Sequence, residues 1–174
     1  MDEAKQRLIR LAQKAHAGER AAALAYRGHI RALTRPEEIA AVKRIENDEW
    51  RHRRQLSRIL AAFGCRPLAL REFVFKAVGT FIAFGCRFCG RFQATYFAGV
   101  LESVNVCEYK EAARLAETLG LAELANEFRE MERTEAEHER VLKEMIGEHP
   151  LLPFFAAVFG WGRSVEASKK IALN

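Results

Sequence analysis

The sequence predicts an all-α protein, and three observations support this. The 174 residues are rich in the helix formers Ala, Leu, Glu and Arg, with only 4 prolines and 11 glycines to interrupt them. Apolar residues recur at three- and four-residue spacing, and clear runs of alternating polar and apolar residues are missing. The length is sufficient for one domain with a core of its own. We therefore expect residues 1–174 to form a single all-helical domain.

The first part of the chain predicts a helical hairpin. Residues 3–33 carry one continuous amphipathic pattern, and the segment TRPEE then interrupts it. Thr34 is expected to cap the helix that follows, with Glu37 completing a capping box. This second helix is expected to end at Phe63, because Gly64 and then a proline follow.

The second part predicts another hairpin, preceded and followed by apolar segments. Residues 68–91 are rich in phenylalanine and predict a less regular stretch, with one short apolar helix and a turn near CGRF. Long helices are expected over 93–118 and 121–146, each followed by glycine. A shorter fifth helix is expected after Pro153 and is predicted to carry the chain to its end.

The charge and cysteine patterns favour neither a nucleic-acid partner nor a zinc site. The net charge is +5, and the basic cluster RHRRQLSR at 51–58 is better explained as a solvated helix face. Cys86 and Cys89 form one C-x-x-C pair, whereas zinc ribbons and fingers need a second close pair. We expect the cysteines to be reduced, and we expect no nucleic acid to bind.

Three apolar stretches are shorter than a membrane-spanning helix: residues 77–86, 92–101 and 150–162. Arg87 and Arg91 interrupt the first two, and such arginines can reach lipid headgroups from a helix lying in the membrane interface. The stretches fit either a buried helix or a helix in the membrane interface, and we expect peripheral membrane contact. Phenylalanines within 73–97 and 154–161 are candidates for an apolar substrate path, and a plain core role is an equal alternative for each of them.

Two Glu-x-x-His motifs, EWRH at 49–52 and EAEH at 135–138, suggest a metal site. Residues three apart on a helix face the same way, so each motif can offer one metal ion an oxygen and a nitrogen. Mixed carboxylate and imidazole ligands suit iron or manganese better than ions that prefer thiolates.

Each expected hairpin holds a further glutamate at the height of its motif. Glu19 and Glu49 lie 15 residues before and after the middle of the first turn, which places both about 22 Å from it. Glu102 and His138 lie 18 residues before and after Gly120. If the hairpins pack as a four-helix bundle, four glutamates and two histidines converge, as in di-metal carboxylate proteins. The candidate metal ligands are Glu19, Glu49, His52, Glu102, Glu135 and His138.

A solvated helix surface rich in glutamate is the alternative interpretation. With 21 glutamates in the chain, a histidine has about a one-in-eight chance of a glutamate three positions earlier. The neighbourhoods favour the metal site, because Glu102 lies in the apolar run FAGVLESVNV and Glu19 lies between AHAG and AAALAY, where an unpaired carboxylate would be costly. We place His16, His29 and His149 outside the site, in structural or surface roles.

The segments HAGERAAALAYRG (16–28) and LESVNVCEYKE (101–111), with the two Glu-x-x-His motifs in this order and spacing, resemble the demethoxyubiquinone hydroxylase family. The similarity extends over nearly the whole chain. These proteins are ferritin-like di-iron monooxygenases, so the resemblance implies a ferritin-like four-helix bundle with additional short apolar helices. It places the family's six ligands on the six candidates above.

The resemblance also implies an activity and its partners. It implies hydroxylation of a ring carbon on a polyprenylated quinone precursor, with O2 and an electron donor such as NADH. The implied cofactor is two iron ions, in preference to a manganese–iron pair. The implied location is the bacterial cytoplasm, at the inner face of the cytoplasmic membrane, with a homo-oligomer as a possible assembly.

One departure from the family concerns the residues after the third-helix glutamate. Family members usually carry a His-Tyr pair there, and this chain has Glu108 and Tyr109. Both are therefore candidate catalytic residues, and the acid in place of histidine leaves the exact substrate open.

Three other functions stay open from the sequence. A rubrerythrin-like peroxidase or a ferritin-like iron oxidase would use the same metal site. A non-catalytic helical protein on a membrane surface would explain the apolar stretches alone. A tRNA-modifying hydroxylase is a weaker alternative, which salt-dependent RNA binding would support.

Overall fold

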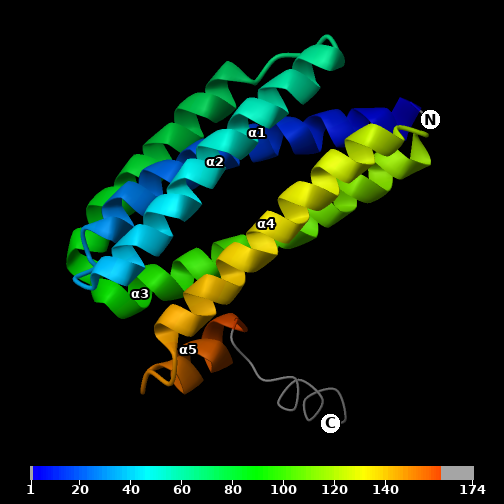
Figure 1. The fold of residues 1–174 in the computed structure, drawn as a ribbon. Helices are drawn as coiled ribbons and strands as arrows, with labels where there is room; N and C mark the ends of the chain where they lie inside the picture. Colours follow the sequence, from blue (N-terminus) through cyan, green and yellow to red (C-terminus); the bar gives the residue numbers. More distant parts are fainter. Residues whose placement is uncertain (1, 162–174) are drawn as a thin grey trace, which may run out of the picture.

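The computed structural model describes residues 2–161, which form five helices and no strand, so the predicted all-α class is confirmed (Figure 1). The third helix turns back near its middle, so that its first half lies beside α1 and its second half beside α4. The molecule therefore has the long antiparallel rods of a ferritin-like bundle. The helices are α1 (Asp2–Ile30), α2 (Pro36–Ala62), α3 (Ala69–Thr118), α4 (Ala122–Ile146) and α5 (Leu152–Phe159).

The turn inside α3 is made by Gly90. Its φ of 71° and ψ of 175° lie outside the helical region and outside what other residues readily adopt. The turn predicted near CGRF is thus confirmed, but the less regular stretch predicted over 68–91 is wrong. From Ala69 to the kink the chain is one regular helix, which includes Gly79 and Gly85.

Two of the glycines allow α1 and the first half of α3 to touch backbone to backbone. A Cβ added to Gly79 would lie 2.5 Å from the carbonyl oxygen of Ala21. A Cβ added to Gly28 would lie 2.3 Å from the backbone of Ala83. Gly79 in the apolar segment therefore allows close helix packing and does not break the helix.

The second helix starts differently from the prediction. Its N-cap position is Arg35, and no side chain makes a capping hydrogen bond there, so the predicted Thr34 capping box is wrong. Pro36 occupies the first turn, where a missing N–H costs nothing, and Glu37 and Glu38 supply the negative charge that suits a helix N-terminus. The helix ends at Ala62, one residue before the predicted end.

The short helix α5 packs on the bundle through aromatic side chains. Trp161 lies against Gly99, where an added Cβ would come within 2.0 Å of the indole ring. Its Nε1 donates a hydrogen bond of 2.8 Å to Glu139 on α4. The hydroxyl of Tyr96 donates to the carbonyls of Phe155 and Trp161, at 3.0 Å each. The rest of the predicted fifth helix, beyond Trp161, lies outside the described residues.

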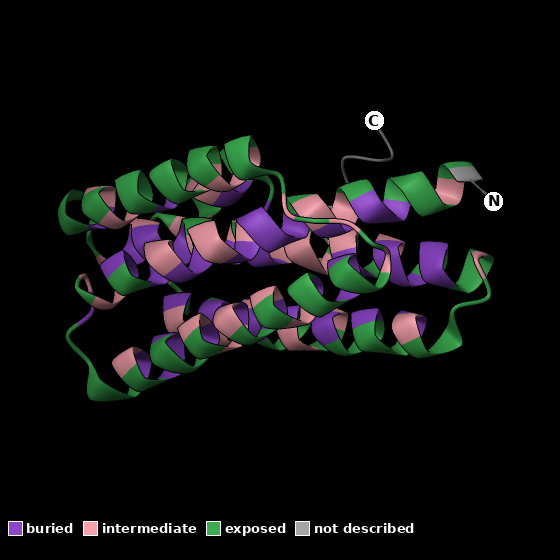
Figure 2. Cartoon of the chain, turned by 90° about the horizontal axis from the view of Figure 1, so that it is seen from above, coloured by how far each residue is buried: buried purple, intermediate pink, exposed green. Residues whose placement is uncertain are grey.

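The core consists of two hydrophobic clusters, one toward each end of the long rods. One contains Leu8, Leu56 and Phe128, and the other contains Val42 and Leu142. Buried residues line the inward sides of the helices (Figure 2). The four long helices of the bundle are α1, α2, the second half of α3 and α4, and each contributes residues to both clusters. In each of them the candidate ligands lie in sequence between the residues of one cluster and those of the other.

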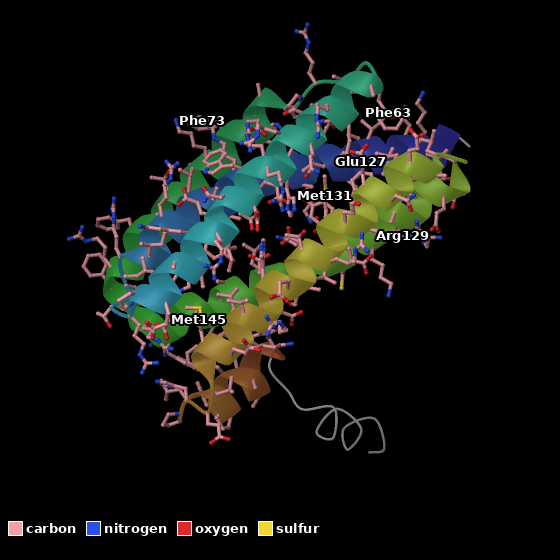
Figure 3. All side chains as sticks on the ribbon, viewed as in Figure 1. Phe63, Phe73, Glu127, Arg129, Met131 and Met145 are labelled. Carbon is pink, nitrogen blue, oxygen red and sulfur yellow. The ribbon has the colours of Figure 1, made fainter. Side chains whose placement is uncertain are left out.

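A long apolar surface remains exposed on the first half of α3. Its most apolar 18-residue stretch is only 11% buried, and the helix is long and apolar enough, by length and composition, to cross a membrane. No such segment was predicted, because charged residues interrupt the apolar runs. Phe73 projects away from the bundle (Figure 3). The large exposed side chains recur at helical spacing and form one apolar stripe: Leu70, Phe73, Val74, Val78, Phe81, Phe84 and Phe88.

One of the two arginines in this region faces the protein. Arg91 makes two hydrogen bonds to the Glu38 carboxylate, of 2.8 and 2.6 Å, and a third to the carbonyl of Met145. It therefore ties the kink in α3 to the start of α2 and the end of α4. This pairing holds the pKa of Glu38 below its usual range.

Candidate metal centre

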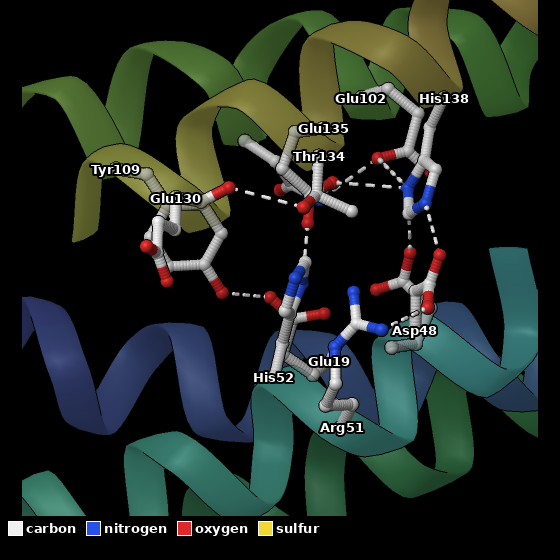
Figure 4. A network of polar contacts seen from close by, with 12 residues as sticks. Glu19, Asp48, Arg51, His52, Glu102, Tyr109, Glu130, Thr134, Glu135 and His138 are labelled. Carbon is white, nitrogen blue, oxygen red and sulfur yellow. Dashed lines mark hydrogen bonds and ion pairs between the residues drawn. The ribbon is translucent and has the colours of Figure 1, made fainter. Parts of the chain in front are cut away.

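The structure brings all six candidate ligands together between the two hydrophobic clusters. Four helices contribute them, with α1 and the second half of α3 each supplying one glutamate and α2 and α4 each supplying a Glu-x-x-His pair. All six side chains are buried. In order of the chain they are Glu19, Glu49, His52, Glu102, Glu135 and His138. Figure 4 shows five of them, labelled Glu19, His52, Glu102, Glu135 and His138, directed toward one another.

The six residues form two overlapping groups, each suited to one metal ion. The first group is Glu19, Glu49, His52 and Glu135, and the second is Glu49, Glu102, Glu135 and His138. Within each group the ligand atoms lie within 4.8 Å of one another. Glu49 and Glu135 belong to both groups, so each of them could serve two ions. The set matches the donors found in di-metal carboxylate proteins.

Buried atoms without hydrogen-bond partners show that the residues fit metal ions. Both carboxylate oxygens of Glu49 are buried and unpartnered, as are one oxygen each of Glu19 and Glu135. His52 Nδ1 comes within 2.7 Å of Glu135 Oε1 without hydrogen-bond geometry. His138 Nδ1 is also unpartnered. A buried polar atom left unbonded destabilises the fold, and coordination to a cation would satisfy each of these atoms.

The electrostatics of this layer favour bound positive charge. Burial raises the pKa of Glu19, and it raises the pKa values of Glu49 and Glu102 well above the usual range, with the neighbouring carboxylates adding to the effect. Burial would also raise the pKa of Glu135, but contacts with Glu102 and His138 outweigh it and lower this pKa. The raised pKa values favour protonation of Glu19, Glu49 and Glu102 in the absence of a cation, and divalent ions would compete with those protons.

Two tyrosines support the terminal carboxylates. The hydroxyl of Tyr109 donates a hydrogen bond to Glu19, and the hydroxyl of Tyr26 donates one to Glu102. Asn105 lies 3.4 Å from an oxygen of Glu102 and 3.4 Å from one of Glu135. Tyr109 was singled out from the sequence, whereas Tyr26 was given no role there. The signal that would have found Tyr26 is its position seven residues after Glu19, because Tyr109 follows Glu102 by the same number.

Asp48 supports His138 from the far side of the imidazole. His138 Nε2 lies 3.2 Å from Asp48 Oδ2, while Nδ1 faces Glu49, Glu102 and Glu135. Burial acts to lower the pKa of His138, but the hydrogen bond with Asp48 and the nearby carboxylate of Glu135 raise it to about 9. A carboxylate on the outer nitrogen fixes the ring orientation of a metal-binding histidine. Asp48 was not among the predicted site residues, although it directly precedes Glu49.

Glu108 does not reach the metal centre. Its carboxylate forms an ion pair with Lys14 of α1. The Glu108 side chain is about one-fifth exposed to solvent. Tyr109, the next residue, is buried and does reach the centre. The two predicted catalytic residues therefore occupy different places, one inside the ligand layer and one at its outer margin.

A small cavity connects these two places. It has a volume of about 110 Å³, and Glu19 and Tyr109 form its polar inner part. Phe75, Leu101 and Val104 supply apolar walls, while Lys14 and Glu108 are among its other lining residues. Leu101 and Val104 are themselves exposed. The cavity therefore runs from the metal ligands toward an apolar part of the surface.

The remaining histidines lie outside the ligand groups. His16 is buried and contacts Glu72 at 2.7 Å and Ser57 at 2.8 Å, so it joins α1 to α3 and α2 and does not contact Glu19. His29 is buried beside Thr95, at 3.0 Å, and His149 stacks on Phe92. Structural roles fit all three. The four cysteines are free thiols.

Comparison with known proteins shows the family of the chain. A family model described as ubiquinone biosynthesis protein COQ7 matches residues 4–142, a span that contains all six candidate ligands and both tyrosines. No curated protein and no solved structure matches the chain. The match covers well over half of the chain and agrees with the family resemblance of its motifs. The chain therefore belongs to the COQ7 family of ubiquinone biosynthesis proteins, the demethoxyubiquinone hydroxylase family.

Proposed function

We propose that the protein is a di-iron monooxygenase that hydroxylates a ring carbon of a polyprenylated quinone precursor. Membership of the COQ7 family supports a role in ubiquinone biosynthesis. The observation that carries the proposal is the pair of overlapping ligand groups, with unpartnered buried atoms in both. Two iron ions in these groups would supply activation of O2, with two electrons from a donor such as NADH.

The chain's own residues have distinct parts in this reaction. The four carboxylates and two histidines would hold the ions in a buried layer between the two hydrophobic clusters. Tyr26 and Tyr109 fix the terminal carboxylates, and Asp48 fixes the ring of His138. The cavity beside Glu19 and Tyr109 is where a substrate ring would approach.

Iron content tests the metal centre. Anaerobic reconstitution with ferrous iron should load about two ions per chain, and fewer than one would count heavily against the proposal. Glu49→Gln should reduce the iron content sharply, because this carboxylate belongs to both ligand groups. Glu46→Gln is the matched control, since Glu46 lies one turn earlier on α2 and pairs with Arg27 outside the site.

Product analysis tests the reaction itself. The reduced, iron-loaded protein should convert a short-chain methoxylated benzoquinol into its hydroxylated product, and ¹⁸O2 should place one labelled oxygen on the ring. Peroxide turnover with no organic product would instead support a rubrerythrin-like peroxidase.

We further propose that the apolar stripe on α3 contacts the inner face of a bacterial cytoplasmic membrane, where such substrates dissolve. Phe81 and Phe84 are 76% and 61% exposed, and burying a phenylalanine contributes about 1.5–3 kcal/mol. The double variant Phe81→Glu/Phe84→Glu should therefore lose most binding to lipid vesicles. Leu121→Glu, which alters an exposed apolar residue in the turn before α4, should bind as the unmodified protein does. Equal binding by all three proteins would contradict the contact.

A further inference from the structure

The ion pair between Lys14 and Glu108 stands at the boundary between two spaces. Inside it is the small cavity that reaches Glu19 and Tyr109. Outside it is an open groove of about 680 Å³, on the same side of α1 and α3. Lys14, Val104 and Glu108 line both spaces. Any group that passes from the groove toward the metal ligands must therefore pass beside this ion pair.

Lys14 differs from the other basic residues of the groove. Arg7 pairs with Glu111 at 2.9 Å, and Arg71 donates to the carbonyl of Arg10 at 3.4 Å. These arginines line the groove but do not line the cavity. Lys14 is thus the cation of the groove that also reaches the cavity. Its ammonium group has three N–H donors, so the bond to Glu108 leaves two for a second partner.

The cavity favours an aromatic ring that carries an oxygen acceptor. Phe75, Leu101 and Val104 offer apolar contacts to the faces of a ring, and the cavity is too small for a whole prenylated molecule. A ring oriented by these walls would still need a polar group at its outer edge to fix which carbon points toward Glu19 and Tyr109. A lysine ammonium at the mouth supplies that group.

We infer that Lys14 is a specificity-determining residue that donates a hydrogen bond to a ring oxygen of the substrate, and that Glu108 positions it. The inference rests on the proposed function for the identity of the site and adds the residue that selects an oxygen-bearing ring. Glu108 acts through Lys14 and has no contact with the metal ligands. Glu108, the acid at the position of the family's histidine, is thus paired with Lys14 on α1.

Equilibrium binding to the metal-free and the iron-loaded protein tests this inference. The probes are a short-chain methoxylated 1,4-benzoquinone and an alkylbenzene of similar shape that lacks ring oxygens. Lys14→Met should weaken quinone binding about tenfold, with alkylbenzene binding unchanged. Glu108→Met should weaken quinone binding by a smaller factor, and Glu108→Gln, which keeps an acceptor for Lys14, should restore it.

Two further variants complete the test. The double variant Lys14→Met/Glu108→Met should bind the quinone no more weakly than Lys14→Met alone, because a residue that acts through another adds no independent effect. Arg7→Met is the matched control: it breaks the other ion pair between α1 and α3 in the same groove, away from the cavity, and should leave quinone binding unchanged. Thermal unfolding and iron content of every variant should match those of the unmodified protein.

The outcomes separate this inference from the proposed function. Quinone binding that is unchanged in Lys14→Met, or quinone and alkylbenzene binding that fall together, would overturn the role of Lys14. So would an unmodified protein that binds the quinone no better than the alkylbenzene. Loss of quinone selectivity in Lys14→Met, in a protein that loads no iron, would support the role of Lys14 while rejecting the di-iron reaction.

Discussion

The hydroxyl of Tyr26 on α1 donates a hydrogen bond to Glu102 on α3. The same relationship runs in the opposite direction, because Tyr109 on α3 donates to Glu19 on α1. In each helix the tyrosine follows the glutamate by seven residues, close to two turns, so both side chains face the ligand layer. The two antiparallel helices thus support each other's carboxylate in a reciprocal arrangement.

Removing either phenol should weaken metal binding while leaving the fold intact. Tyr26→Phe and Tyr109→Phe each remove a hydrogen bond that orients a terminal carboxylate, and the loss of such a bond lowers metal affinity by about 10–100-fold. Ferrous or zinc titration measures this. Tyr96→Phe is the control, since Tyr96 is a buried tyrosine that bonds backbone carbonyls near α5. An equal loss of metal affinity in all three variants would indicate a general effect on packing.

The overlap of the two ligand groups predicts different metal contents for two glutamate variants. Glu19 belongs to one group, so Glu19→Ala should retain about one ion per chain. Glu135 belongs to both groups, so Glu135→Ala should retain almost none. Metal analysis after dialysis measures both, with Glu137→Ala on the exposed side of α4 as the control. Equal metal contents in Glu19→Ala and Glu135→Ala would argue against shared carboxylates.

The stability that the protein gains from bound metal ions should increase with pH. Glu19, Glu49 and Glu102 have pKa values raised above 4.5 in the folded protein, so the metal-free fold binds more protons than the unfolded chain. Their stabilising effect is fully present below pH 4.5 and is lost as pH rises through the folded pKa values. The pKa of Glu135 is lowered, so this residue has the opposite effect, but the three carboxylates with raised pKa values outnumber it.

Denaturant unfolding at about pH 5 and about pH 8 measures this dependence. The metal-free protein should be less stable at the higher pH, and the metal-loaded protein should gain more from its ions there, because ions and protons compete for the same oxygens. A metal-dependent gain that is equal at both pH values would show that the ions bind elsewhere or that these carboxylates are already charged.

Much of the centre could be predicted because helix geometry is regular. Equal numbers of residues on either side of a turn give equal heights, and this alone placed Glu19 beside Glu49, and Glu102 beside His138. The same regularity explains why Glu108 lies outside the ligand groups, whereas Tyr109 reaches Glu19. Glu108 follows Glu102 by six residues, about 120° away from it around the helix, whereas Tyr109 returns to the same side.

Other features depend on contacts that one sequence does not specify. The pairing of Lys14 with Glu108, and of Arg91 with Glu38, joins residues more than 50 positions apart. Gly79, within the regular helix between Ala69 and the Gly90 kink, faces the backbone of α1 at Ala21, and this contact could not be predicted from the sequence. Whether a glycine breaks a helix or allows close packing depends on what lies opposite, which is a tertiary property.

The glycines of α3 allow that distinction to be measured. Gly79→Ala would place a methyl group 2.5 Å from the carbonyl oxygen of Ala21, so α1 and α3 would have to separate. We expect a loss of about 1–3 kcal/mol in the free energy of unfolding, as for overpacked sites. Gly85 lies in the same helix with no atom within 4 Å of an added Cβ. Gly85→Ala should therefore raise stability by about 0.5–1 kcal/mol through helix propensity. Urea unfolding of the two variants measures both effects, and a loss of stability in Gly85→Ala equal to that in Gly79→Ala would contradict the close backbone contact.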